Sequence, residues 1–277
     1  MQNIITFPKL GLEFKVSRAA FEIGDFPIFT YGLLITLGLI IAVIYGYKQC
    51  KVNSLDTDDF FNMLILAIPV SIICARAYYV IFSWNQYRND ILSIFDIRSG
   101  GLAIYGGVIG AAAVVIIYCR KKKINIGVVL DMLAVGLLIG QAIGRWGNFV
   151  NGEAFGTVTD LPWAMTIESD GRITAENVHP TFLYESIWNA LGIIVLLVYK
   201  RHTLFNGELF CGYMAWYGLG RMFIEGLRSD SLYLFGTVRV SQMLAVLTFA
   251  VGIGVIIIRR RRMLKATQAE NGKGECG

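Results

Sequence analysis

Long runs of apolar residues are the feature that most constrains what this chain can fold into. A helix of about 20 apolar residues crosses a hydrocarbon core of about 30 Å. Runs of roughly this length lie at about 28–47, 60–82, 102–119, 127–144, 181–199, 208–227 and 239–258. The sixth is the least hydrophobic, because it holds Glu208, Arg221 and Glu225. The pattern predicts an all-α polytopic membrane protein with about seven transmembrane helices.

The composition agrees with a membrane protein. Of 277 residues, 55% are hydrophobic and 16% are charged, and the mean hydropathy is +0.58, whereas soluble domains are about 25% charged. The net charge of +5 does not indicate a nucleic-acid partner, because the basic residues gather at the ends of the apolar runs. The five cysteines form no CxxC pair, so neither a disulfide framework nor a zinc site is expected.

The basic residues are distributed unevenly along the chain, and cytoplasmic segments of membrane proteins are enriched in Lys and Arg. If the first helix runs from outside to inside, thirteen basic residues up to position 265 lie on the cytoplasmic side: Lys48, Lys51, Arg120, Lys121, Lys122, Lys123, Lys200, Arg201, Arg259, Arg260, Arg261, Arg262 and Lys265. Nine lie on the outer side: Lys9, Lys15, Arg18, Arg88, Arg98, Arg145, Arg172, Arg228 and Arg239. The asymmetry predicts an outside N-terminus and a cytoplasmic C-terminus. It also requires the sixth helix, without which the runs at 200–201 and 259–262 would lie on opposite sides.

We expect a single transmembrane domain over residues 1–265, with a small outer-face element at about 145–180. Residues 1–25 lack the regions of a signal peptide and are expected to be a retained tail. Residues 266–277 are small and polar and are expected to form a disordered cytoplasmic tail. No internal repeat is evident, which weakens the case for a transporter built from repeated halves.

The densest polar cluster follows the fourth apolar run, in the segment GRWGNFVNGEAFG at 144–156. Its glycines predict tight turns, and Arg145, Asn148, Asn151 and Glu153 supply polar groups that can converge on a ligand. The alternative is an interfacial loop whose arginine reaches the lipid headgroups.

A second cluster lies in the sixth run. At about 100° per residue, the spacing of Tyr217, Arg221, Glu225 and Arg228 places them within an arc of about 80° on one helix face. The alternative is an Arg–Glu pair that neutralises itself inside the bundle. Ionisable groups within a membrane are costly, so a functional role is favoured.

Further polar residues fall on the same predicted side: Tyr31, Tyr105, His179 with Pro180, and Tyr184 with Glu185. Arginine binds phosphate through a planar fork and stays charged when partly buried. The convergence therefore predicts a phosphate-binding site that faces the outer leaflet, with a phospholipid as substrate. A transporter or flippase for an anionic lipid or small anion is the alternative class.

The segment GRWGNFVNGEAFG resembles the signature of the prolipoprotein diacylglyceryl transferase family. Three further segments resemble this family in the same order: GGLAIYGGVIG at 100–110, HPTFLYES at 179–186 and YGLGRMFIEGLR at 217–228. Tyr31 and Gly32 also fit. The similarity extends from the first apolar run to the sixth.

The resemblance implies a bacterial enzyme with seven spans, working at the outer face of the cytoplasmic membrane. Its members transfer the sn-1,2-diacylglyceryl group of phosphatidylglycerol to the lipobox cysteine of preprolipoproteins, which forms a thioether and releases glycerol phosphate. This is the first step of bacterial lipoprotein maturation. The implied partners are phosphatidylglycerol, lipobox peptides and membrane lipid, and no metal or organic cofactor is implied.

By position, Arg145 resembles the family arginine that binds phosphatidylglycerol, and Arg221 resembles its catalytic arginine. The other residues expected at the site are Tyr31, Tyr105, Asn148, Asn151, Glu153, His179, Tyr217 and Glu225. Tyr105 stands where better-known members have histidine, and a phenol with an ordinary pKa of about 10 is a poor base. We expect Tyr105 to donate a hydrogen bond, while Glu153 or Glu225 accepts the thiol proton or holds an arginine. His179 is an alternative base, although its place beside Pro180 favours a structural cap or a substrate contact.

Overall fold

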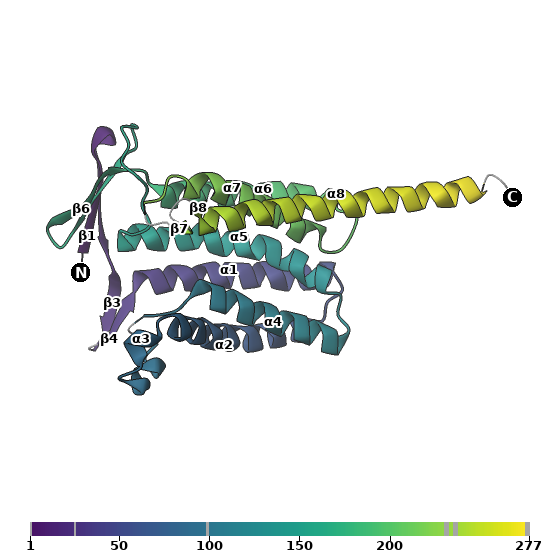
Figure 1. Ribbon diagram of the computed structural model, residues 1–277, viewed down its shortest axis with the longest axis horizontal. Helices are drawn as coiled ribbons and strands as arrows, with labels where there is room; N and C mark the ends of the chain where they lie inside the picture. Colours follow the sequence, from purple (N-terminus) through teal and green to yellow (C-terminus); the bar gives the residue numbers. More distant parts are fainter. Residues whose placement is uncertain (1, 25, 98–99, 230–232, 235–237, 275–277) are drawn as a thin grey trace. The chain divides into compact units, whose positions relative to one another are not determined.

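The computed structural model describes residues 2–24, 26–97, 100–229, 233–234 and 238–274 (Figure 1). Arg98, which was counted on the outer side, and Cys276, the last of the five cysteines, lie outside these ranges. The chain divides into two compact units, one formed by residues 1–46 with 130–277 and the other by residues 47–129. Each unit is described below by itself.

In the described residues, six helices are long and apolar enough to cross a membrane. They are α1 (Thr30–Val52), α2 (Thr57–Phe82), α4 (Ile104–Lys122), α5 (Ile126–Asn151), α6 (Thr181–Tyr199) and α8 (Val240–Gly274). The sixth predicted run also forms a helix, α7 (Glu208–Glu225), but its charged residues keep it outside the apolar set. The prediction of a polytopic membrane protein is confirmed at this level.

The smaller unit, residues 47–129, is built on the packing of α2 against α4 (Figure 1). The N-terminus of α2 is capped by Asp56, whose carboxylate accepts a hydrogen bond from the backbone of Asp58 at 3.0 Å. Gly106 and Gly110 bring the helices close together, since a Cβ at Gly106 would overlap the Cys74 carbonyl and one at Gly110 would crowd the Cys74 side chain. The short helices α3 (Trp84–Tyr87) and η2 (Ile91–Phe95) belong to the segment of the chain that connects α2 to α4.

Arg76 on α2 is 5% exposed and holds the segment that leads into α4. Its guanidinium donates to four backbone carbonyls: Ser93 at 2.7 Å, Ile94 at 2.7 Å, Gly100 at 2.8 Å and Gly101 at 3.0 Å. It also lies 5.1 Å from the centre of the Tyr87 ring. One buried side chain therefore fixes the backbone that precedes Tyr105.

The larger unit carries an antiparallel sheet at one end of its helices (Figure 1). The strand order is β2 (Leu12–Ser17), β1 (Gln2–Phe7), β5 (Met165–Ser169), β6 (Arg172–Val178). A hairpin of β3 (Ala19–Ile23) and β4 (Phe26–Phe29) leads directly into α1, and β7 (Tyr233–Leu234) pairs with β8 (Val238–Arg239). The all-α prediction is therefore wrong outside the long helices.

The sheet forms because its strands bury one face against the ends of α5 and α6. In β1, burial alternates, so that Asn3, Ile5 and Phe7 point inward. Ile5 and Phe7 belong to a cluster with residues from α5, α6, β5 and β6: Phe149, Val150, Met165, Ile167, Ala175, Val178 and Phe182. Residues 2–7 and 12–17, which were expected to belong to a tail, thus form strands of one sheet with residues 165–169 and 172–178.

Two tryptophans join α6 to α7. The indole N–H of Trp188 donates to the Trp216 carbonyl and that of Trp216 donates to the Trp188 carbonyl, both at 3.0 Å. Their rings stack with centroids 4.4 Å apart. Gly192 and Gly220 make room for the indoles, because a Cβ on either glycine would overlap one of them.

The N-terminal end of α7 carries a cluster of charged residues. Glu208 is fully buried and accepts hydrogen bonds from Tyr199 at 2.6 Å, from the Leu204 backbone at 2.7 Å and from Arg260 at 2.6 Å. Asp131 of α5 accepts hydrogen bonds from the backbone N–H groups of Gly207, the N-cap residue of α7, and of Phe210. Helix α8 extends to Gly274 and so includes most of the tail expected to be disordered, while residues 275–277 are not described.

Candidate functional site

An ion-pair network joins α5, α6 and α7 at the end of the larger unit that carries the sheet. Glu185 of α6 is its centre. One carboxylate oxygen of Glu185 lies 2.6 Å from Arg145 Nη2, and the other lies 2.9 Å from Arg221 Nη1 and 3.9 Å from Arg228 Nη1. Arg221 extends the network, with Nη2 lying 2.6 Å from Glu225 Oε2.

The guanidiniums are more accessible than the carboxylates. The side chains of Arg145, Arg221 and Arg228 are 20%, 16% and 13% exposed, against 5% for Glu185 and 2% for Glu225. Among these five side chains, three arginines against two glutamates leave a net charge of +1. These five side chains therefore carry excess positive charge, and the arginines are more exposed than the glutamates. This arrangement suits the binding of an anionic group.

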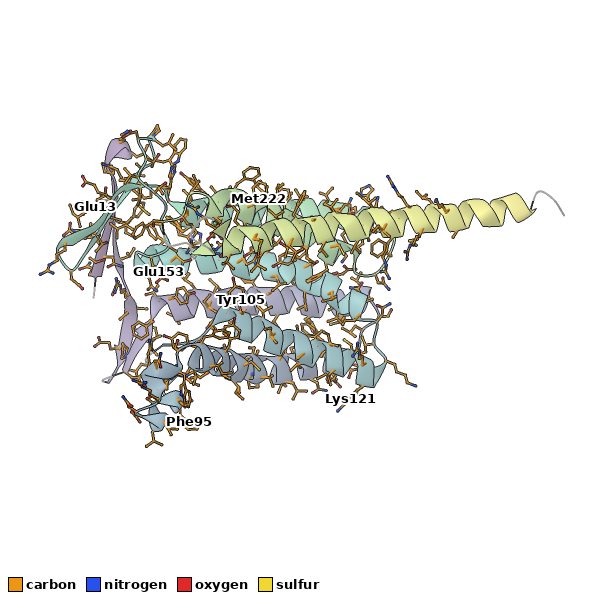
Figure 2. All side chains as sticks on the ribbon, in the orientation of Figure 1. Glu13, Phe95, Tyr105, Lys121, Glu153 and Met222 are labelled. Carbon is orange, nitrogen blue, oxygen red and sulfur yellow. The ribbon has the colours of Figure 1, made fainter. Side chains whose placement is uncertain are left out.

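A second branch of the network runs along the end of α5. Arg145 Nη1 donates to Asn148 Oδ1 at 3.3 Å, and Asn148 Nδ2 donates to Glu153 Oε1 at 2.9 Å. Asn151 Nδ2 donates to the same oxygen of Glu153 at 3.3 Å. Figure 2 shows Glu153 just beyond α5, toward the sheet. The four residues predicted from this motif thus form one connected chain.

The motif is helical through Asn151, which corrects the prediction of tight turns and the alternative of an interfacial loop. Gly147 lies within the helix and is needed for packing, because a Cβ there would overlap the Tyr31 ring of α1. Gly152 adopts the left-handed conformation, with φ of +67°, and so does Ala154, with φ of +56°. Gly152 ends the helix through a Schellman motif, in which the N–H groups of Gly152 and Glu153 bond to the carbonyls of Phe149 and Asn148, both at 3.1 Å.

Helix α7 ends three residues before Arg228, so the predicted arc on one helix face does not include that arginine. The i,i+4 pair of Arg221 and Glu225 is present, as the alternative interpretation expected. The pair is not isolated, however, because Arg221 also forms an ion pair with Glu185. The backbone of Arg228 forms an isolated antiparallel β-bridge with Gly156. Beside it, the carbonyl of Leu227 accepts a hydrogen bond from Thr157 N at 2.8 Å.

Two predicted residues make other contacts. The Tyr217 ring stacks on Tyr213, with centroids 5.9 Å apart. The His179 ring contacts the hydroxyl of Tyr184 at 3.2 Å, and that hydroxyl accepts from Trp163 at 2.7 Å. Burial lowers the pKa of His179 below its ordinary value, so the ring is neutral near pH 7. The N-cap residue of α6 is Pro180, and the expected role of His179 as a structural cap or a substrate contact stays a prediction.

Tyr105 belongs to the smaller unit. It lies in the first turn of α4, where its half-exposed ring is 6.4 Å from the ring of Tyr78. Its expected role beside the arginines stays a prediction.

Glu185 is the residue that sequence reasoning failed to assign to the site. It was noted as polar and on the expected side, but it was given no role. The available signal was a carboxylate inside an apolar run, the same signal that singled out Arg221.

The fold and the cluster together define a polytopic membrane protein with a largely buried network of arginines and glutamates at one end of its helices. Comparison with known proteins is more specific. The family model described as prolipoprotein diacylglyceryl transferase matches residues 18–258, and the chain belongs to this family.

Curated relatives agree. A phosphatidylglycerol–prolipoprotein diacylglyceryl transferase of Finegoldia magna is 44% identical over 255 residues, covering 91% of this chain and 100% of the relative. The proteins of the same name from Pediococcus pentosaceus and Listeria monocytogenes are 42% and 44% identical, and each match covers 88% of this chain and 90% of the relative.

Proposed function

We propose that this chain transfers the sn-1,2-diacylglyceryl group of phosphatidylglycerol to the lipobox cysteine of preprolipoproteins, with the cluster around Glu185 as the phosphate site. The observation that carries the proposal is the cluster of three guanidiniums on two more deeply buried carboxylates, in a member of this transferase family. A flippase or transporter would also need arginines, but the curated relatives are named as transferases.

The reaction replaces one bond of the glycerol carbon that carries the phosphate ester. The cysteine thiolate attacks this carbon, a C–S bond forms and the C–O bond to phosphate breaks. The bonding electrons leave with the phosphate oxygen of glycerol phosphate, where negative charge accumulates. Arg145 and Arg221 stabilise that charge, since oriented donors at a developing anion lower the barrier by about 3–4 kcal/mol each.

Glu153 is better suited than Glu225 to accept the thiol proton. Glu225 is 2% exposed and paired with Arg221, whereas Glu153 is exposed. Both amide donors to Glu153 use Oε1, which leaves Oε2 as the proton acceptor. Glu225 then orients Arg221, and Asn148 and Asn151 orient Glu153.

The test of the function is direct. Purified protein is incubated with phosphatidylglycerol and a lipobox peptide, and mass spectrometry of the peptide reports an added diacylglyceryl group. A peptide with serine in place of the cysteine is the control. Unmodified cysteine peptide, with correctly folded protein, would contradict the proposal.

The remaining architecture completes the proposal. Helix α7 is the seventh span, the N-terminus and the sheet lie outside, and the C-terminus is cytoplasmic. Residues 1–265 act as one transmembrane catalytic domain in the bacterial cytoplasmic membrane. The positions of the basic residues support this orientation.

Cysteine labelling tests the orientation. Asp170 lies in the exposed turn between β5 and β6, and Lys121 is exposed near the end of α4 (Figure 2). In a background without native cysteines, Asp170→Cys should react with an impermeant maleimide in intact cells or spheroplasts, and Lys121→Cys should react only after permeabilisation. The reverse labelling pattern would invert the proposed topology.

Tyr105 is proposed to donate a hydrogen bond to the substrate. Tyr105→Phe should reduce turnover about tenfold, the scale of one hydrogen bond of about 1–1.5 kcal/mol, while Tyr105→His should remain active because imidazole also donates. Tyr78→Phe is the matched control, because its ring is the neighbour of Tyr105. A loss of several orders of magnitude in Tyr105→Phe would instead indicate the general base.

A further inference from the structure

The end of α5 carries most of the motif assigned to the site, and its last four backbone carbonyls need partners outside the regular helix. These carbonyls belong to Asn148, Phe149, Val150 and Asn151, and the last turn of any α-helix leaves such groups without helical partners. The Schellman motif at Gly152 satisfies the first two. The other two are satisfied from elsewhere in the chain.

Both remaining partners come from the first eighteen residues. The side-chain amide of Asn3 in β1 donates to Val150 O at 2.8 Å. The Arg18 guanidinium, through Nη2, donates to Asn151 O at 3.1 Å. The N-terminal segment therefore completes the capping of the helix end that presents Asn148 and Asn151 and leads into Glu153.

Asn3 is fixed in a way that suits this role. It is 1% exposed, and its side-chain oxygen, Oδ1, accepts a hydrogen bond from Ser169 Oγ at 2.8 Å. The register of β1 against β5, with Asn3 opposite Ser169, sets its position along the strand. A buried polar side chain is costly unless bonded, so a simple core position would favour an apolar residue here.

We propose that Asn3 and Arg18 are positioning residues for the transfer reaction. They act through α5, holding its last turn so that Asn148 and Asn151 orient Glu153. The inference rests on the proposed function, because it assumes that the end of α5 is part of the site. It adds Asn3, which precedes the family match, and Arg18, which is the first residue of that match.

The decisive experiment compares Arg18→Met with Arg18→Lys. Arg18 is only partly buried, so both variants should fold, and only lysine can still donate to Asn151 O. We expect kcat to fall about tenfold in Arg18→Met, with KM for phosphatidylglycerol unchanged within about twofold, and to recover in Arg18→Lys. Wild-type kcat in Arg18→Met would overturn the proposal.

Asn3→Leu gives the second arm, with Gln2→Leu as its matched control. Leucine is similar in size to asparagine but cannot bond to Val150 O, whereas Gln2 is exposed on the opposite face of β1. Asn3→Leu should lower kcat about tenfold, and Gln2→Leu should not. A lower melting temperature with normal kcat in Asn3→Leu would mean a structural role only and would also overturn the proposal.

The Glu153→Gln background separates this inference from the proposed function. If Asn3 and Arg18 act through Glu153, Arg18→Met should cause no further loss of kcat in that background. Should Glu153→Gln and Asn148→Ala retain full activity, the site itself is wrong and the positioning role falls with it. Should they be impaired while Asn3→Leu and Arg18→Met are not, only the positioning role is wrong.

Discussion

Replacing Arg221 by lysine should lower kcat/KM by at least about 100-fold, although the charge is retained. The guanidinium spans two carboxylates, with Nη1 on Glu185 and Nη2 on Glu225. A single ammonium nitrogen cannot reproduce this fork, so it cannot present fixed donors to a phosphate. The expected loss corresponds to about 2.7 kcal/mol, the scale of one oriented donor at a developing anion.

The measurement is the rate of diacylglyceryl transfer to a lipobox peptide, at several phosphatidylglycerol concentrations. Arg145→Lys should behave similarly, because Arg145 divides its nitrogens between Glu185 and Asn148. The matched control is Arg172→Lys, an exposed arginine on β6 that should be unaffected. Wild-type turnover in Arg221→Lys and Arg145→Lys would show that both arginines have only a structural role.

Glu185→Gln should have the second large effect, on both activity and stability. The carboxylate of Glu185 separates Arg145 from Arg221, and it is 5% exposed. Removing one partner of a buried ion pair costs about 3–5 kcal/mol, because it leaves buried charge uncompensated. Here the loss also allows two guanidiniums to repel each other and leave their positions.

We therefore expect Glu185→Gln to lower activity by about 100-fold or more and to lower the unfolding temperature in detergent. Added phosphatidylglycerol should restore part of the lost stability, since its phosphate supplies the missing negative charge. The control is Glu176→Gln on β6, where the glutamate is exposed. Normal activity in Glu185→Gln would show that the arginines keep their geometry without a central carboxylate.

The long helices could be predicted from the sequence because hydrocarbon thickness sets their length. Helix α2 covers Thr57–Phe82 against the expected 60–82, and α6 covers the expected 181–199. The end of α5 was predicted too early, at 144 and not at Asn151. The glycines at 144 and 147 suggested turns, but neighbouring side chains use these positions for close packing.

The sheet was missed because its strands are short and pair across long distances in the chain. Strand β1 alternates in burial, but its pairing with β5 joins Asn3 to Ser169. Nothing local in the sequence specifies such a partner. The ion-pair cluster could be predicted only in part. Its arginines stand out in the sequence as charges in or beside apolar runs, whereas Glu185, the carboxylate that connects them, was given no role.

The buried Arg76 has a consequence for how the chain is inserted during synthesis. Helix α2 leaves the ribosome before the carbonyls of residues 93–101 that bind its guanidinium. Until then, α2 would carry an arginine without these partners, which costs up to about 2.5–3.5 kcal/mol near the centre of a membrane helix. We expect α2 to wait beside the translocon for this segment and to enter the lipid together with α4, as a helical hairpin.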